Sequence, residues 1–273
     1  MGLILGDDGL PADEVGVWAK EKHTYLKRYL DISRSTRNKY IGERKGGAVY
    51  FDLFSGSGRS RIRGTKEWID GGAVAAWKTS RDGGAPFTDI YISDLDEDRL
   101  DACTARLRKL EAPVHSIHAS ALDAAENMVS AVSGYALHFA FVDPYNLEAL
   151  DFRVIQALSG LKRIDLLIHL SAMDLQRNLS INLTADNSAF DAFAPGWRDK
   201  VSTTGAQSEV RRRVVEYWRE LVANLGVWPS TGQRLISGEN NQPLYWLLLA
   251  ARHALAHKFW ETAANIEGQR KLF

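Results

Sequence analysis

The sequence predicts an α/β protein with a mostly parallel sheet that ends in an antiparallel hairpin and carries a helical insertion. Three observations support this prediction. From about residue 46, short apolar runs alternate with amphipathic segments; the alternation stops at residue 174; and two strand-like runs flank a Gly-Glu-Asn-Asn turn near the end. Strands that alternate with helices are joined by right-handed crossovers, which give a parallel sheet with helices on both faces.

The N-terminal part of the chain combines a weak pattern with a strong one. Met1–Glu14 is weakly patterned, and we expect it to be frayed. Aromatic and leucine residues then recur at helical spacing over Trp18–Ile32, which predicts an amphipathic helix before the first strand. The apolar run Val49–Phe54 predicts that strand. A loop rich in Arg and Gly follows to about Lys66, and Trp68–Lys78 can form the first crossover helix.

The middle of the chain continues the alternation. Asp96–Leu110 has acids at its start and bases at its end, which matches the dipole of a helix. Short apolar runs around it predict strands, and the amphipathic segments between them predict helices. The further expected strands are Ile90–Ser93, Val114–His118, Leu137–Val142 and Ile164–Leu170, and the further expected helices are Ala121–Val132 and Glu148–Leu158.

The last hundred residues depart from this pattern. Asp174–Gly226 is polar, aromatic and helical, and we expect an inserted subdomain or lid. Gln233–Ser237 and Leu244–Ala250 predict a hairpin, and His253–Ile266 predicts a final helix. A parallel sheet that ends in such a hairpin is typical of the Rossmann-like class I methyltransferase fold. A nicotinamide-type dinucleotide fold would normally end with a parallel strand.

We therefore expect three parts: an N-terminal helical segment at 1–45, a methyltransferase-like α/β domain at 46–173 and 227–273, and a helical insertion or lid at 174–226.

Composition agrees with a globular protein and gives no sign of a polyanion-binding surface. The 273 residues are 45% hydrophobic and 25% charged, and Lys+Arg and Asp+Glu both number 34. One cysteine, Cys103, excludes a disulfide framework, and the histidines lack ligand spacing, so we predict no metal site. No apolar run is long enough for a bilayer and we see no secretory signal, so we expect a soluble, cytoplasmic protein without a membrane partner.

The run Ala48–Gly58 is the most informative feature of the chain. An apolar, aromatic strand carries Asp52 and closes in a Gly-x-Gly turn, where the absence of side chains lets the backbone approach a ligand. This arrangement resembles the first motif of methyltransferases that use S-adenosyl-L-methionine (SAM), although an ordinary tight turn is the alternative. The resemblance implies a cofactor site at Asp52, Phe54, Ser55, Gly56 and Gly58.

Two further strand ends supply candidate cofactor contacts, because ligands of open α/β sheets bind beyond the carboxyl ends of the strands. Asp94 ends the second strand, where an acid normally accepts the paired ribose hydroxyls, and Leu95 follows it. The alternative is a helix cap, a role that Asp94 or Asp96 could fill. After the third strand, Ser120 or Asp123 could reach the adenine edge, with capping as the alternative.

The fourth strand end is Phe141-Val-Asp-Pro-Tyr-Asn146. It resembles the Asp-Pro-Pro-Tyr motif of methyltransferases that act on exocyclic amino groups, except that the second proline is absent. In that motif the acid and the proline carbonyl accept hydrogen bonds from the target amine and the tyrosine stacks on the base. The resemblance implies that Asp143, Pro144, Tyr145 and Asn146 form the catalytic site. An Asp-Pro pair that only starts a helix is the alternative.

Other residues invite weaker interpretations. Arg59, Arg61 and Arg63 follow the glycine turn and could hold the phosphates of a nucleic acid, or lie in a solvated loop. Arg211–Arg213 is expected on a helix surface, and the tryptophans are expected in the core. Carbon-5 cytosine methyltransferases share the glycine turn but need a Pro-Cys nucleophile, which Cys103 does not provide.

The pattern as a whole resembles the three-Cys-motif partner (TcmP) family. The similarity rests on Lys22–Leu30 with Tyr50–Gly58, on Phe141–Tyr145, and on Asp165–Leu170 and Tyr245–His253 with their neighbours. It implies a SAM site and a methyltransferase-like reaction centre, and a partner protein that carries a cysteine motif. Lys22 and His23 precede the first strand, where several amino-methyltransferases place residues that cover the cofactor.

We therefore predict a SAM-dependent methyltransferase that acts on an exocyclic amino group of a nucleobase in DNA or RNA. Two alternatives stay open: a non-catalytic or partner-dependent scaffold that keeps the cofactor fold, and a methyltransferase that acts on a protein or small molecule.

Overall fold

The structure is a computed structural model, and it describes residues 2–238 and 242–265. Its main sheet has the strand order β10-β12-β9-β8-β3-β6-β7, and β11 pairs with β12. The strands are β3 Ala48–Asp52, β6 Asp89–Asp94, β7 Val114–His118, β8 Leu137–Val142, β9 Ile164–Ser171, β10 Trp228–Pro229, β11 Arg234–Ser237 and β12 Pro243–Ala251. The strands β7, β6, β3, β8 and β9 are parallel, whereas β12 is antiparallel to β9. This topology confirms the predicted Rossmann-like class I methyltransferase fold.

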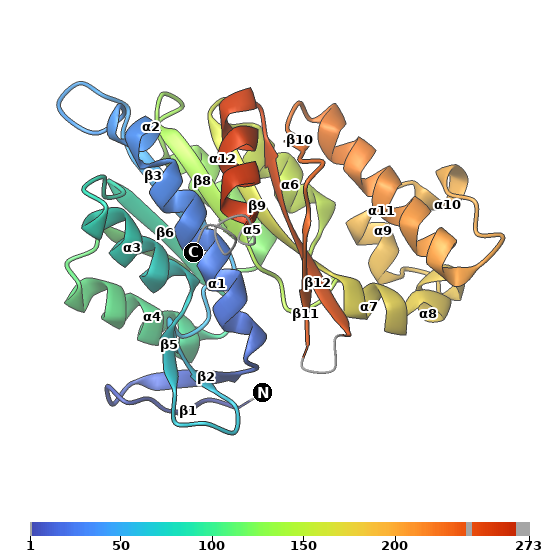
Figure 1. Cartoon of the computed structure of the whole chain (residues 1–273), viewed down its shortest axis with the longest axis horizontal. Helices are drawn as coiled ribbons and strands as arrows, with labels where there is room; N and C mark the ends of the chain where they lie inside the picture. The colour runs from blue at the N-terminus through green and yellow to red at the C-terminus, as the bar shows by residue number, and fades with distance from the viewer. Residues whose placement is uncertain (1, 239–241, 266–273) are drawn as a thin grey trace, which may run out of the picture.

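Helices cover both faces of this sheet (Figure 1). The face in view carries α1 Trp18–Ile32, α3 Gly72–Asp82, α4 Glu97–Lys109 and α12 Ala254–Ala264, and the opposite face carries α5 Ala121–Ala131 and α6 Phe152–Ser159. The short helix α2 Arg34–Asn38 follows α1. Each face has its own buried apolar cluster, because alternate residues of β3 and β8 point to opposite sides of the sheet.

The N-terminal residues form part of a second sheet, so the expectation that Met1–Glu14 is frayed is wrong. The order of this sheet is β1-β2-β4-β5, with the strands β1 Ile4–Leu5, β2 Pro11–Val15, β4 Arg59–Ile62 and β5 Trp68–Asp70. The segment predicted as an Arg/Gly loop after the glycine turn therefore supplies a strand. Parallel pairing of β2 with β4 holds the N-terminal residues against it. In Figure 1 this small sheet lies at the lower left.

Two predicted helices begin later than expected. Trp68–Asp70 is strand β5, and the helix predicted from Trp68 starts at Gly72, because β5 pairs with β4 before the chain turns at Gly71. The helix predicted from Glu148 starts at Phe152, because the Asp151 side chain accepts a hydrogen bond from the backbone of Arg153 and caps it. The predicted Gly-Glu-Asn-Asn turn falls largely on residues 239–241, and the predicted last helix ended at Ile266; both lie outside the described residues.

Five helices connect β9 to β10: α7 Ala172–Arg177, α8 Leu179–Thr184, α9 Ala189–Phe193, α10 Trp197–Lys200 and α11 Gln207–Asn224. They lie at the right of Figure 1. Their largest apolar side chains, including Trp197 and Trp218, belong to the same buried cluster as the α5–α6 face of the sheet. Trp228 departs from the predicted core role, since it is 52% exposed. Within the described part of the chain, no helix is long and apolar enough to cross a membrane.

Candidate active site

Strand register brings the candidate residues to one edge of the sheet. β3 lies between β6 and β8, and Asp52 is paired with Ile92 on one side and Phe141 on the other. The loops that leave these three strands therefore start side by side. They carry the glycine turn, Asp94 and the Asp-Pro-Tyr-Asn run.

The glycine turn follows β3 and is held against the end of β6. Gly56 and Gly58 have φ angles of 56° and 77°, which favour glycine. A Cβ atom on Gly58 would lie 2.9 Å from the Sγ atom of Cys103, so α4 approaches too closely for any other residue. The Gly56 amide donates to Asp94 Oδ2 at 2.9 Å, and the Ser55 amide donates to the carbonyl of Ser93 at 3.0 Å.

Asp94 and Asp96 have separate roles. The Asp96 side chain caps α4 by accepting from the Arg99 amide at 3.1 Å, so of the two acids it is the cap. Asp94 accepts from the Gly56 and Asp96 amides, one on each oxygen, and each oxygen keeps a lone pair for a further donor. Next to it, Leu95 is 66% exposed. An acid with an exposed apolar neighbour is a suitable arrangement for a ribose and an adenine.

Ser120 follows β7 and caps α5. Its hydroxyl accepts from the Asp123 amide at 3.2 Å and donates to Asp123 Oδ2 at 2.7 Å. These bonds correspond to the capping alternative. The adenine contact stays a prediction.

Asp52 lies under the glycine turn. Its side chain is almost fully buried, at 1% exposure, and accepts from the Phe54 amide at 3.2 Å and from the Tyr50 hydroxyl at 3.3 Å. Burial, together with the nearby carboxylate of Asp143, raises the pKa of Asp52 to about 7. Phe54 is half-buried and Ser55 is buried, so both shape the turn around this acid.

Asp143 is held by two basic side chains from other elements. Its Oδ2 atom lies 2.5 Å from Lys22 Nζ on α1, and its Oδ1 atom lies 2.8 Å from His169 Nδ1 on β9. The Lys22 Nζ atom is 6.0 Å from the ring centroids of both Phe141 and Tyr245. The His169 ring packs edge-on against Tyr245, with 4.1 Å between the centroids. Lysine and carboxylate thus meet in a largely buried, aromatic environment.

These neighbours decide the charge of Asp143. Burial alone would raise its pKa, but Lys22 and His169 outweigh that effect and lower the pKa to about 2. Burial lowers the pKa of His169 despite its contact with Asp143. Burial and the charge of Lys22 lower the pKa of His23 to about 3, so His23 is neutral. At neutral pH the cluster therefore contains an ionised Asp143.

The three residues after Asp143 differ in exposure. Pro144 is buried, whereas Tyr145 is 79% exposed and presents its ring to solvent. The side-chain oxygen of Asn146 accepts from the Ala149 amide at 2.8 Å. This bond uses the amide oxygen of Asn146 in a turn and leaves the NH₂ group, a donor, for other contacts.

Sequence analysis missed two residues of the cluster, His169 and Tyr245. Both were noted only as part of longer stretches. The available signal was that His169 stands two residues before the end of the fifth parallel strand, at the edge where ligands bind. Lys22 was noted, but its contact with Asp143 was not foreseen.

The predicted arginine run is engaged within the molecule. Arg59 lies 2.6 Å from Asp7 and 2.9 Å from Asp70, and Arg61 lies 2.9 Å from Glu14. Arg63 lies 3.6 Å from the same glutamate. Arg59 and Arg61 belong to strand β4, where acids neutralise them, so they form neither a solvated loop nor a free phosphate site. Arg63 lies in the exposed turn after this strand and is also close to an acid.

Comparison with known proteins completes this description. No protein-family model matches the chain, and no curated protein matches it in sequence. The structure is similar to the protein LPL1258 from Legionella pneumophila, a DUF519 protein, with a TM-score of 0.52 at 11% identity over 90% of this chain and 91% of that one. It is also similar to an O-methyltransferase from Bacillus cereus in complex with SAH (S-adenosyl-L-homocysteine), with a TM-score of 0.49 at 11% identity over 89% of this chain and 85% of that one.

A third similar structure is the N-methyltransferase NodS from Bradyrhizobium japonicum in complex with S-adenosyl-L-homocysteine (SAH), with a TM-score of 0.43 at 10% identity over 87% and 89% of the chains. At 11% identity, the similarity to LPL1258 shows a shared fold alone, and this fold agrees with the strand order above. The resemblance to the three-Cys-motif partner family is not confirmed by these comparisons and stays a prediction.

Proposed function

We propose that the protein is a SAM-dependent methyltransferase that acts on an exocyclic amino group of a nucleobase in DNA or RNA. The observation that carries this proposal is the register of β3 with β8. It places the glycine turn and the Asp143–Asn146 run on neighbouring strand ends, with Asp94 on the strand beyond. A cofactor held by the turn would therefore lie beside the acid that receives the target amine.

The residues at this edge are chemically suited to the cofactor. The left-handed backbone at Gly56 and Gly58 gives close access, Asp94 offers acceptors for the ribose hydroxyls, and Leu95 offers an apolar surface for the adenine. Asp52 lies beneath the turn, where its ionised form would favour the amino group of the cofactor. When bound, SAM supplies an electrophilic methyl group on a sulfonium centre.

The chain's own residues would then orient the acceptor. Asp143 is ionised by Lys22 and His169, so it can accept a hydrogen bond from an amino group, and the Pro144 carbonyl can accept the second. These two bonds would aim the lone pair of the nitrogen at the methyl group. The nitrogen would gain the methyl group as the sulfur–methyl bond breaks, which leaves SAH, and the nitrogen would then lose one proton to solvent. The exposed ring of Tyr145 would stack on the base.

Partners of the site follow from the same proposal. The nucleic acid would approach the exposed Tyr145, and the helices of 174–226, which follow the carboxyl end of β9, would form a substrate-facing wall. A partner protein with a cysteine motif would be needed if the chain binds cofactor but transfers no methyl group alone. The contacts of Asp143 with Lys22 and His169 favour a requirement for such a partner, because the target amine has to share an oxygen of Asp143 with one of these side chains.

The first test is calorimetric titration with SAM and SAH. The wild type should bind both, and Asp94→Asn, which keeps the shape of the side chain, should bind at least tenfold more weakly because an ionised acceptor for the ribose is lost. Asp89→Asn is the matched control, since Asp89 lies at the opposite end of the same strand. Equal binding by both variants would overturn the cofactor site.

The second test follows methyl transfer from labelled SAM to single-stranded DNA and RNA. Asp143→Asn should abolish transfer while SAH affinity stays within about twofold. Loss of SAH binding in that variant would make Asp143 a cofactor or folding residue. If the wild type binds SAM but transfers no methyl group, the result favours a non-catalytic or partner-dependent scaffold. If it methylates only proteins or small molecules, the proposed nucleobase substrate is wrong.

A further inference from the structure

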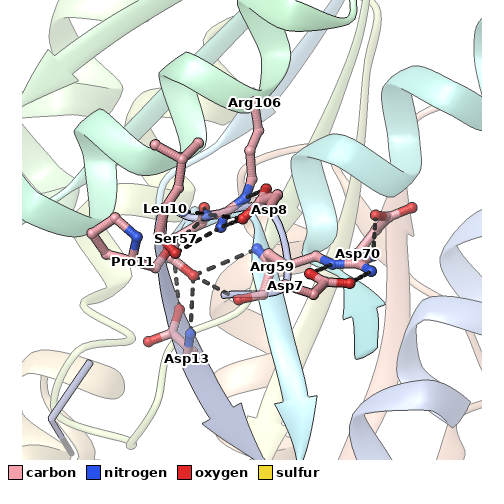
Figure 2. Close-up of polar contacts among 9 residues, drawn as sticks. All are labelled: Asp7, Asp8, Leu10, Pro11, Asp13, Ser57, Arg59, Asp70 and Arg106. Carbon is pink, nitrogen blue, oxygen red and sulfur yellow. Dashed lines mark hydrogen bonds and ion pairs between the residues drawn. The ribbon is translucent and has the colours of Figure 1, made fainter. Parts of the chain in front are cut away.

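The N-terminal ribbon, strands β1 and β2 at residues 4–15, is fastened directly to the glycine turn (Figure 2). Asp13 and Ser57 bond to each other twice. The Ser57 amide donates to Asp13 Oδ2 at 2.9 Å, and the Asp13 amide donates to the Ser57 hydroxyl at 3.1 Å. Ser57 is the residue between the two glycines of the turn, so the ribbon fixes both its backbone and its side chain.

Asp13 is itself held in place from the other side. Its Oδ1 atom accepts from Arg99 Nε on α4 at 2.8 Å. Its Oδ2 atom lies 3.1 Å from the position that a Cβ atom on Gly56 would occupy. The carboxylate therefore rests on the backbone of the turn at Gly56 and Ser57 and is oriented by a charged partner.

Arg106 makes a second fastening in the same place. Its guanidinium, buried at 6% side-chain exposure, forms a bidentate pair with Asp8, with both distances 2.7 Å. It also donates to the backbone carbonyls of Pro11 and Ser57 at 2.7 Å each. Figure 2 shows these bonds converging from α4 on the ribbon and the turn. One buried arginine thus ties the ribbon, the glycine turn and α4 together.

We infer that Asp13 and Arg106 are positioning residues for the cofactor, and that docking of the N-terminal ribbon and binding of the cofactor are coupled. This inference rests on the proposed function. The turn at 56–58 contains two glycines, whose backbone can adopt many conformations, so contacts from the surroundings are needed to hold it in one left-handed geometry. The ribbon supplies such contacts through Ser57.

The coupling is reciprocal by thermodynamic necessity. If the docked ribbon shapes the turn for the cofactor, then the cofactor stabilises the docked ribbon. Hydrogen exchange of the ribbon should therefore slow when SAH binds. The exchange of β7, at the far edge of the main sheet, should change much less.

The experiment compares two carboxylate-to-amide changes on adjacent residues of β2. Asp13→Asn removes the charge that accepts from Ser57 and Arg99. Glu14→Gln is the control, because Glu14 pairs with Arg61 and not with the turn. By calorimetry, Asp13→Asn should weaken SAH affinity about tenfold, as expected for a lost charge-assisted hydrogen bond, and Glu14→Gln should change it less than twofold.

A second measurement needs no cofactor. Hydrogen exchange of the peptide that contains Ser57 should be faster in Asp13→Asn than in Glu14→Gln. The two variants should have equal thermal stability, so that the difference reports the turn and not global unfolding. If the wild type binds SAH, and the two variants have equal SAH affinities and equal hydrogen exchange at Ser57, this inference is wrong but the proposed function stands. Absence of SAH binding by the wild type would overturn the proposed function and the inference with it.

Discussion

Two largely buried carboxyl groups lie under the same helix at opposite ends of the sheet, and their pKa values are shifted in opposite directions. Asp143 follows the carboxyl end of β8, and Asp165 stands at the amino end of the neighbouring strand β9. Helix α1 faces both: Lys22 meets Asp143, and the Tyr29 hydroxyl donates to Asp165 Oδ2 at 2.8 Å. Lys22 and Tyr29 are seven residues apart, which is about two helical turns, so one helix face serves both ends.

Burial opposes the ionisation of both acids, and their partners on α1 differ in how far they offset it. Asp143 has a lysine and a histidine, and its pKa is lowered to about 2 although burial opposes ionisation. Asp165 has a phenol, and burial raises its pKa to about 6. Arg37 lines the same cavity as Asp165 but donates to the backbone carbonyls of Leu30 and Ala85. The pKa of Asp143, at the edge where ligands bind, is thus held below its usual value, whereas the pKa of Asp165, at the opposite edge, is raised.

The largest expected effect comes from removing the lysine. Lys22→Met leaves Asp143 largely buried with a single basic neighbour, so the free energy of unfolding should fall by about 3 to 5 kcal/mol, as for other broken buried pairs. Urea unfolding at pH 7.5 measures this loss. Lys27→Met is the control on the same helix, because Lys27 is exposed. Equal losses in the two variants would mean that Lys22 only contributes helix packing.

The pair Lys22–Asp143 should also shape the acid limb of stability. The pKa of Asp143 is lowered on folding, so its contribution is present above the unfolded value of 3.8 and is lost as pH falls toward about 2. Asp165 has the opposite sign.

A smaller effect is expected from Asp165→Asn. The pKa of Asp165 is raised on folding, so the wild type loses stability as pH rises from about 4 to about 6. The asparagine cannot ionise but can still accept from Tyr29. Its free energy of unfolding relative to the wild type should therefore rise by about 2 to 3 kcal/mol between pH 4 and pH 7.

Urea unfolding of both proteins across this pH range makes the measurement, with Asp101→Asn as the exposed control. A difference between Asp165→Asn and the wild type that stays constant with pH would show that Asp165 does not titrate in this window. That result would mean that the pKa values of Asp143 and Asp165 do not differ in the way described above.

Local patterns were enough to predict the main sheet and much of the candidate site. The central strands β3, β6 and β8 are largely apolar runs that end in or are followed by an acid, so the position of Asp94 and Asp143 at one edge follows from the topology rule. The N-terminal ribbon could not be predicted in this way. Its strands are only two and five residues long, and a contact between Arg106 and Asp8, 98 residues apart, holds them.

The same distinction applies within the site. Asp143 was found because its immediate neighbours form a motif. Its charge depends on Lys22, 121 residues away, and on His169 of the next strand. No periodicity links these three positions. Residues that define a loop are local in sequence, whereas residues that set the charge of a buried group come from packing.

The smallest expected effect sharpens the comparison at the cofactor end. Burial raises the pKa of Asp52 to about 7, in the same direction as for Asp165, but Asp52 lies under the glycine turn. If its ionised form favours the amino group of the cofactor, binding below pH 7 has to release a proton. SAH affinity should then fall by up to about tenfold for each pH unit below 7.

Titrations with SAH at pH 5.5, 6.5 and 7.5 test this dependence, and buffers of different ionisation enthalpy report the released proton. Asp52→Asn should bind more weakly at pH 7.5 and show little pH dependence, because the group that titrates is gone. Asp94→Asn should weaken binding and keep the slope, since Asp52 remains. A slope that persists in Asp52→Asn would assign the proton to another group and make Asp52 a structural acid like Asp165, so that Asp143 alone would distinguish the two ends of the sheet.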